Sequence, residues 1–341
     1  MLPFRTRGYR TVPYGMFRLE DYGLAAKNAR VLERIYHKGH QLAWDGKEVL
    51  QSLIEQHGKP TLAPREKEAL GRVFSIIMWG ELAAWRISAE LADELEPLEA
   101  KMAATSQAFD EARHFYVMHD YLEALDALPK KMDRGAQALL EAVMNADHLA
   151  KKLLGMQLMI EPIALTLFHV VKKLDVEPVL SHLLPYYERD EARHVALGVQ
   201  YLPAMLSQMS VSQRLSLWGF QFRLITYEIW SNYGLSRDLL VLGVDPREML
   251  ELGQGKQMKA LEMLFEKSVV SSDIPMNILS RYADALSELT LPTFGTHRPF
   301  QDRVQAALRV MLHGSHVQSV ELTPEVTAEQ TPLIRQEEAA A

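Results

Sequence analysis

The sequence contains no cysteine, and this absence excludes several kinds of site at once. Disulfide bonds, thiolate nucleophiles, iron–sulfur clusters and thiolate-bound zinc all require cysteine. Any metal ion held by side chains must therefore be bound by His, Asp and Glu. The chain of 341 residues supplies 12 His and 44 Asp+Glu for this purpose.

Two further absences limit the partners that the sequence predicts. There is no excess of positive charge, because 37 Lys+Arg face 44 Asp+Glu for a formal net charge of −7, so no nucleic-acid partner is expected. No uncharged apolar run approaches the roughly 18 residues that span a bilayer, so no membrane span is expected. The basic N-terminal segment MLPFRTRGYRTVPYGMFR lacks the apolar core of a secretory signal. We therefore expect a cytoplasmic protein.

Strand-like alternation is also missing, and helical spacing of apolar residues runs from about residue 21 to about residue 320. This pattern predicts an all-α protein in which residues 21–320 form a single helical domain. Residues 1–20 are expected to form an N-terminal arm, because Pro, Gly and aromatic residues interrupt helical spacing there. The polar, Pro- and Ala-containing residues 321–341 are predicted to be a disordered tail.

An internal repeat organises the central half of the chain. The pentapeptide DEARH occurs at 110–114 and again at 190–194, an offset of 80 residues. Within each copy, Glu and His are three residues apart, which places both side chains on one face of a helix. Thirty residues before the Glu of each copy, Glu81 and Glu161 lie in apolar surroundings where an unpaired carboxylate would be costly. The repeat therefore predicts two copies of one helical hairpin with acidic residues turned inward.

The lengths of the two arms of each hairpin bring these residues to one level. Sixteen residues separate Glu81 from Pro97 and fourteen separate Pro97 from Glu111, which at about 1.5 Å per residue are nearly equal lengths of helix. Packing two such hairpins predicts a four-helix bundle over residues 60–209, with additional N- and C-terminal helices around it. Four Glu and two His then converge, which is the ligand set of a di-iron or di-manganese carboxylate site.

The doubled pattern of Glu, 28 residues and then Asp-Glu-x-x-His resembles the ferritin-like di-iron carboxylate oxygenases and oxidases. The resemblance covers roughly residues 60–209 and implies a ferritin-like fold that binds two iron ions, with a Mn/Fe pair as the alternative. The metal ligands that it implies are Glu81, Glu111, His114, Glu161, Glu191 and His194. It also implies that Asp110 and Asp190 accept hydrogen bonds from the two imidazoles. Arg113 and Arg193 are then expected to hold these aspartates.

Several positions depart from the subfamilies that share this pattern. Met118 stands where ribonucleotide reductase small subunits carry a radical tyrosine, and Leu165 stands where hydroxylases carry an active-site threonine. Tyr187 and Gln107 each lie four residues before a ligand Glu and are expected to point toward the site. Tyr187 has two interpretations: a catalytic phenol beside the metals, or a core tyrosine whose hydroxyl is bonded elsewhere.

The resemblance implies an O2-dependent oxidoreductase, a monooxygenase among other options, that hydroxylates, N-oxygenates, desaturates or cleaves a small organic substrate. Such an enzyme needs an external electron donor such as a reductase or ferredoxin, and a homodimer is one expected assembly. The alternatives are a ferritin-type ferroxidase or iron-binding protein, and a ligand-binding Mn/Fe oxidase. The roughly 110 helical residues after Met209 favour an organic substrate, since a minimal bundle suffices for iron storage.

Overall fold

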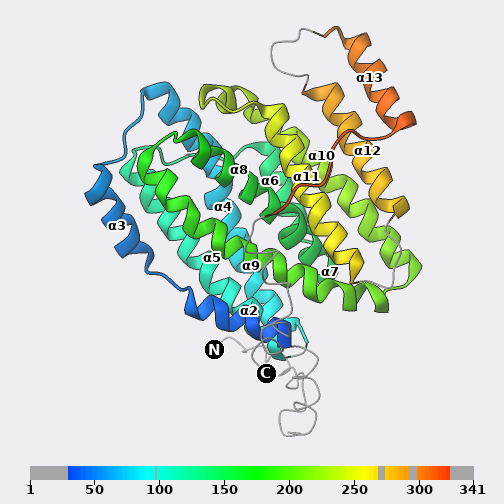
Figure 1. Cartoon of the computed structure of the whole chain (residues 1–341), viewed down its shortest axis with the longest axis horizontal. Helices are drawn as coiled ribbons and strands as arrows, with labels where there is room; N and C mark the ends of the chain where they lie inside the picture. Colours follow the sequence, from blue (N-terminus) through cyan, green and yellow to red (C-terminus); the bar gives the residue numbers. More distant parts are fainter. Residues whose placement is uncertain (1–29, 97, 268–272, 292–297, 323–341) are drawn as a thin grey trace, which may run out of the picture.

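The computed structural model describes residues 30–96, 98–267, 273–291 and 298–322, and every regular element in these ranges is a helix (Figure 1). The expectation of an all-α protein is confirmed for this part of the chain. The N-terminal arm, the start of the helical domain before residue 30 and nearly all of the predicted tail lie outside the described residues. The helices are α2 (Arg30–Gln41), α3 (Gly46–His57), α4 (Pro64–Glu94), α5 (Leu98–Ala124), α6 (Arg134–Met144), α7 (Leu149–Leu153), the π-helix η1 (Leu154–Ile160), α8 (Glu161–Leu174), α9 (Pro178–Gln208), α10 (Val211–Val241), α11 (Pro246–Glu266), α12 (Asp273–Thr290) and α13 (Phe300–His313).

Local sequence explains where several of these helices begin. Proline occupies the first turn of α4, α9 and α11, where its missing N–H costs no hydrogen bond. The Asp45 side chain accepts from the first backbone amides of α3, and Ser210 and Gln213 form a capping box on α10. Pro178 opens the returning helix of the second predicted hairpin, directly after the cap Glu177.

Two pairs of long helices form the centre of the molecule. Helix α4 packs along α5, the continuous run α7–η1–α8 packs along α9, and α5 and α9 contact each other. Helices α2 and α3 cover α5 and α9 on one side, while α10 packs against α4 and α11 packs against α8 (Figure 1). The additional helices expected at both ends of the bundle therefore enclose it from different sides.

The buried apolar side chains form two large clusters that are separated along the central helices. On α5, Ala104 belongs to one cluster and Val117 to the other; on α4 the division falls between Met78 and Ala83. The buried polar residues of the repeat lie in the interval between them. A polar layer thus crosses the core at mid-height, where only paired or ligand-bound charges are stable.

One stretch, Leu149–Leu174, is long and apolar enough to cross a membrane by length and composition alone. Its most apolar window has a mean hydropathy of 1.6 and is 78% buried inside the molecule. The sequence lacks a long uncharged apolar run, and this stretch does not contradict that, because it contains Lys151, Lys152 and Glu161. The core helix of a soluble protein passes the same test, so the run is weak evidence for a membrane span.

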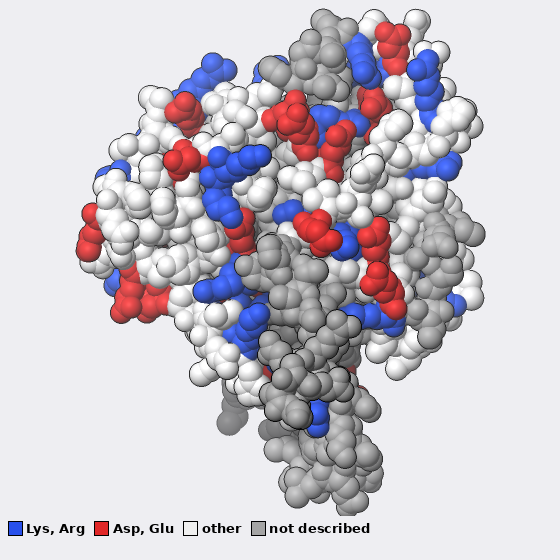
Figure 2. Space-filling model, in the orientation of Figure 1, with Lys and Arg blue, Asp and Glu red and all other residues white. Residues whose placement is uncertain are grey.

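Figure 2 shows one face of the molecule, on which acidic and basic side chains are interspersed.

Candidate metal centre

The structure brings the six predicted ligand residues together in the polar layer. Their carboxylate oxygens and imidazole nitrogens form two groups, within each of which the atoms lie less than 4.8 Å apart. The first group is Glu81, Glu111, His114 and Glu191, and the second is Glu111, Glu161, Glu191 and His194. Because Glu111 and Glu191 belong to both groups, the two clusters are adjacent and share two carboxylates.

Both imidazoles turn the same nitrogen toward the shared carboxylates. His114 Nδ1 lies 3.1 Å from Glu191 Oε1 and 3.5 Å from Glu81 Oε2. His194 Nδ1 lies 2.8 Å from Glu191 Oε2 and 3.1 Å from Glu111 Oε1. All of these side chains are buried, and Glu81 is the most exposed of the six at 5%. The cluster is therefore shielded from bulk water.

Three buried atoms of the cluster have no hydrogen-bond partner among the described residues: Glu111 Oε2, His114 Nδ1 and Glu191 Oε1. Buried polar atoms of this kind are rare, and an unrecorded ion or water is one of the standard explanations. Carboxylate and imidazole donors are the ligands that iron and manganese accept. The donor set and its unpartnered atoms fit a buried site that could hold metal ions.

Burial and mutual repulsion divide the carboxyl groups into two kinds. Burial, together with the charge of Glu191, raises the pKa of Glu81 and of Glu161 well above the ordinary value. Burial and the charge of Glu111 also oppose ionisation of Glu191, but the neighbouring His194, together with Glu161 and His114 beside it, outweighs them and lowers its pKa to about 2. The two imidazoles likewise lower the pKa of Glu111, against the effect of burial. The two shared carboxylates are thus the ones most strongly held in the ionised form.

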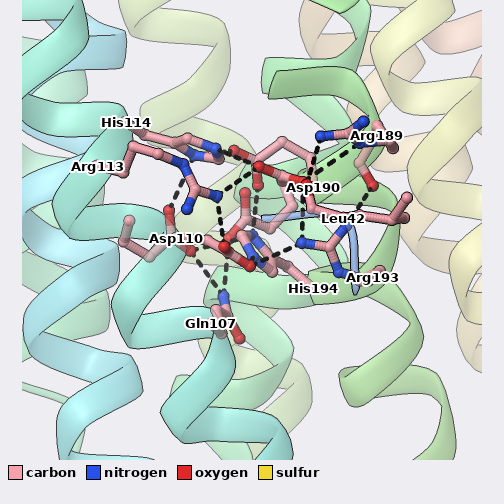
Figure 3. A network of polar contacts seen from close by, with 12 residues as sticks. Leu42, Gln107, Asp110, Arg113, His114, Arg189, Asp190, Arg193 and His194 are labelled. Carbon is pink, nitrogen blue, oxygen red and sulfur yellow. Dashed lines mark hydrogen bonds and ion pairs between the residues drawn. The ribbon is translucent and has the colours of Figure 1, made fainter. Parts of the chain in front are cut away.

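The opposite nitrogen of each imidazole faces an aspartate, and the pairing is crossed between the two repeats (Figure 3). His114 Nε2 of the first copy lies 3.1 Å from Asp190 Oδ2 of the second, and His194 Nε2 of the second lies 3.5 Å from Asp110 Oδ2 of the first. Although burial opposes a charged imidazole, these carboxylates and the glutamates raise the pKa of both histidines well above the ordinary value. An aspartate at Nε2 fixes the ring orientation and leaves Nδ1 directed at the cluster.

Both arginines of the repeat bind both aspartates. The Arg113 guanidinium donates to Asp110 Oδ1 at 2.5 Å and to Asp190 Oδ2 at 2.8 Å. Arg193 lies 2.8 Å from Asp110 Oδ2 and 2.9 Å from Asp190 Oδ1. We call these four residues the Asp–Arg ring; all four are buried, and two negative charges balance two positive ones.

Gln107 and Tyr187, the two residues expected to point toward the site, have different surroundings. Gln107 donates to Glu111 Oε1 at 2.9 Å and to Glu161 Oε1 at 3.3 Å, and it accepts from Gln157. The Tyr187 ring stacks on the His114 imidazole with centroids 4.3 Å apart, but its hydroxyl donates to the backbone carbonyl of His114 at 2.7 Å. This geometry agrees with the second interpretation of Tyr187, a core tyrosine whose hydroxyl is bonded outside the carboxylate cluster.

The sequence reasoning missed Trp44. Its indole Nε1 donates to Asp190 Oδ2 at 2.7 Å from the segment that joins α2 and α3, and its ring lies 4.8 Å from the Arg113 guanidinium. The contact joins residues 146 positions apart. Residue spacing cannot predict a contact over such a separation. The sequence does mark the segment itself, because Trp44 stands beside Asp45, the residue that caps the next helix.

Glu161 is reached through an irregular helix. The π-helix η1 lies immediately before Glu161, and the Glu161 amide donates to the carbonyl of Met156, five residues earlier. Pro162 has no N–H to donate to the preceding turn, which favours such a departure from α-helical pairing. Short π-helical segments are frequent at functional sites.

A third group, His119, Asp120 and Glu123 on α5, is partly or fully exposed and consists of neighbours in one helix. It lacks the burial and the unpartnered atoms of the other two.

No protein-family model matches the chain, and a comparison with curated proteins finds no significant relative.

Proposed function

We propose that the protein is a ferritin-like non-haem di-iron oxidoreductase that uses O2 to oxidise a small organic substrate. The observation that supports this most strongly is the sharing of Glu111 and Glu191 between two adjacent buried carboxylate–histidine groups. A single-ion site needs only one such group, so the doubled set favours two ions. Glu81 and His114 would complete one position, and Glu161 and His194 the other.

Two ferrous ions bound here would supply electrons for the reduction of O2. The side chains of the protein would hold the metal ions and orient the ligand groups. Asp190 and Asp110 accept hydrogen bonds from Nε2–H of the two imidazoles, which leaves Nδ1 available as the ligand atom. Gln107 donates to Glu111 and Glu161, which restricts the directions that these carboxylates can adopt.

Burial of the cluster also bears on the chemistry. Enclosure between two apolar clusters keeps bulk water away, so that reactive oxygen species would meet the substrate rather than solvent. Restoring the ferrous state after each turnover requires an external electron donor, which would be a reductase or a ferredoxin acting in the cytoplasm. The reaction type, among hydroxylation, N-oxygenation, desaturation and C–C cleavage, depends on the substrate pocket rather than on the ligands.

Metal analysis followed by reaction with O2 tests the proposal. Protein produced with iron should contain about two Fe per chain, and anaerobic reduction followed by O2 should give a transient absorption band. Glu191→Ala should lose most of the iron because both groups contain this residue, whereas His119→Ala, in the exposed group, should retain it. Protein that takes up only zinc, or no metal, would refute a di-iron function. Oxidation of many Fe per chain into a mineral core would instead identify a ferroxidase.

A further inference from the structure

A second buried polar position lies away from the metal cluster, in a cavity enclosed by five helices. The cavity has a volume of about 650 Å³, including its open mouth. Its walls come from α4, α6, α8, α10 and α11 and are mostly apolar. The residues that line it include Ile77, Ile163, Thr166, Glu228, Asn232 and Gly253.

Glu228 on α10 is the one titratable side chain that lines this cavity from any of the five helices. It is 6% exposed, and its single recorded hydrogen bond comes from Gln257 Nε2, which donates to Oε2 at 3.0 Å. No Lys, Arg or His of the described residues pairs with it. Burial raises its pKa to about 7, and no neighbouring charge contributes to that shift. A buried carboxyl without a cation is costly in its ionised form unless a ligand supplies the positive charge.

The other polar groups around the cavity can each accept a hydrogen bond, and the Ser231 hydroxyl and the Asn232 amide can also donate one. Thr166 donates its hydroxyl proton to the carbonyl of Pro162 at 2.8 Å, so its oxygen can only accept from a ligand. Asn232 also lines the cavity, and its side-chain oxygen has no partner. Between Thr166 and Glu228 lies Gly253: a Cβ added there would be 3.8 Å from Thr166 Oγ1 and 4.0 Å from Glu228 Oε1. The missing side chain leaves open space between two acceptors.

The cavity borders the candidate metal centre through the helices that carry its ligands. Ile77 lies one helical turn before Glu81 on α4, and Ile163 lies two residues after Glu161 on α8. Glu228 is on α10, which contributes no residue to either metal group. The walls around a ligand held at Glu228 therefore include apolar residues of the two helices that carry Glu81 and Glu161.

We propose that this cavity binds a small organic cation, an apolar molecule with one primary ammonium group, whose nitrogen donates to Glu228 and Thr166. An ammonium has three donors and no acceptor, which matches the Glu228 carboxylate and the Thr166 hydroxyl oxygen. The apolar remainder of the ligand replaces water against aliphatic side chains. That this cation is the substrate rests on the proposed oxidoreductase function, whereas the binding itself does not.

Binding of n-pentylamine, compared with 1-pentanol of nearly equal size, tests the site in the full-length protein by titration calorimetry at pH 8. The amine should bind at least about 10-fold more tightly, because a charge-assisted hydrogen bond exceeds a neutral one by roughly that factor. Glu228→Gln should lose this preference while binding pentanol as before. Gly253→Leu should weaken both probes, since its side chain occupies the open space and Leu is favourable in a helix.

Three results would overturn the inference. They are equal affinity for amine and alcohol, undiminished amine binding by Glu228→Gln, and amine binding that disappears when a chelator removes metal, which would place the nitrogen on the metals. Circular dichroism and thermal unfolding establish that both variants are folded. If the protein binds the amine but takes up no iron, the cation site is supported and the proposed function is refuted. If the protein takes up iron but does not bind the amine, the proposed function is supported and the cation site is refuted.

Discussion

At the scale of single residues, the Asp–Arg ring decides how the two histidines are held. Four buried charges are arranged so that each carboxylate contacts both guanidiniums. Such a network contributes little net stability over apolar packing, but removal of one member leaves an uncompensated buried charge. The ring is therefore expected to be sensitive to single substitutions to a degree that surface ion pairs are not.

We expect Arg113→Leu to lower the free energy of unfolding by about 3–5 kcal/mol, because Asp110 and Asp190 are left with one guanidinium. Urea denaturation at pH 7 measures this. Lys67→Ala is the matched control: it breaks the exposed Lys67–Asp126 pair, in which Asp126 is 89% exposed, and should cost less than about 1 kcal/mol. A cost for Arg113→Leu no larger than that of the control would contradict the role assigned to the ring.

Glu228 leads to a prediction about pH. Its pKa is about 7 in the folded chain and 4.5 ordinarily, so the stability associated with its protonated form is fully present below pH 4.5 and is lost as pH rises through 7. Glu228→Gln removes this dependence. The variant should gain about 2 kcal/mol relative to the parent between pH 5.5 and pH 8, at 1.36 kcal/mol per pKa unit. Parallel denaturation curves of the two proteins at these pH values test it, and a pH-independent difference would show that Glu228 is ionised throughout.

The sequence predicted more about which residues meet than about how they pair. Repeat spacing predicted that Glu111 and Glu191 would converge, because helical rise converts residue number directly into height. Repeat spacing could not predict that Asp190 of the second copy pairs with His114 of the first. Both copies read DEARH, so pairing within a copy and pairing between copies fit the same sequence pattern. The direction of the Tyr187 hydroxyl depended on a backbone carbonyl of another helix, which no spacing encodes.

At the scale of elements, η1 is the least regular part of the central helices and is closely packed against α9. A Cβ added at Gly198 would lie 2.7 Å from Gln157 Cβ and 3.2 Å from Leu158 Cδ2. Gln157 donates to Gln107, which in turn donates to Glu161. The contact between α9 and η1 therefore bears on the position of a candidate ligand.

We expect Gly198→Ala to destabilise the protein by about 1–3 kcal/mol, because an added methyl must displace the rigid base of the Gln157 side chain. Gly219→Ala on α10 is the control: a Cβ there meets nothing within 4 Å, and replacing a helical glycine should stabilise by up to about 1 kcal/mol. Thermal unfolding of both variants gives the comparison. Equal shifts in the same direction would mean that η1 moves aside freely.

Pro162 is a position at which the sequence predicts less than the structure shows. The sequence identifies the missing backbone donor, but a helix can accommodate that loss by a kink or by a widened turn. The structure has the widened turn, the π-helix η1.

At the scale of the whole molecule, helical periodicity was sufficient to predict an all-α chain. It could not assign α10 to the side of α4 or α11 to the side of α8, because both have apolar residues on more than one face. These two helices supply much of the wall of the cavity that contains Glu228. This cavity was consequently the feature of the molecule least accessible from the sequence.

Metal binding should be measurable as global stability, because ligands from α4, α5, α8 and α9 are tied together by it. Free metal at 100 times its dissociation constant should stabilise the folded state by about 2.7 kcal/mol per site, and chelation should lower the melting temperature accordingly. Glu111→Ala should abolish this response and His119→Ala should preserve it. A melting temperature unaffected by chelation in iron-containing protein would indicate that the metal lies elsewhere.

The crossed pairing of the two repeats has a consequence for symmetry. Each hairpin supplies one glutamate, one Glu-x-x-His and one Asp–Arg pair, and each orients the histidine of the other. Neither hairpin can assemble half a site alone, but two identical copies related by a twofold axis would make every contact in duplicate. The 80-residue offset thus relates two similar halves of one chain. Trp44, which contacts the aspartate of only one copy, and the pair Gln107 and Tyr187, which differ at matching positions, distinguish the two candidate metal positions.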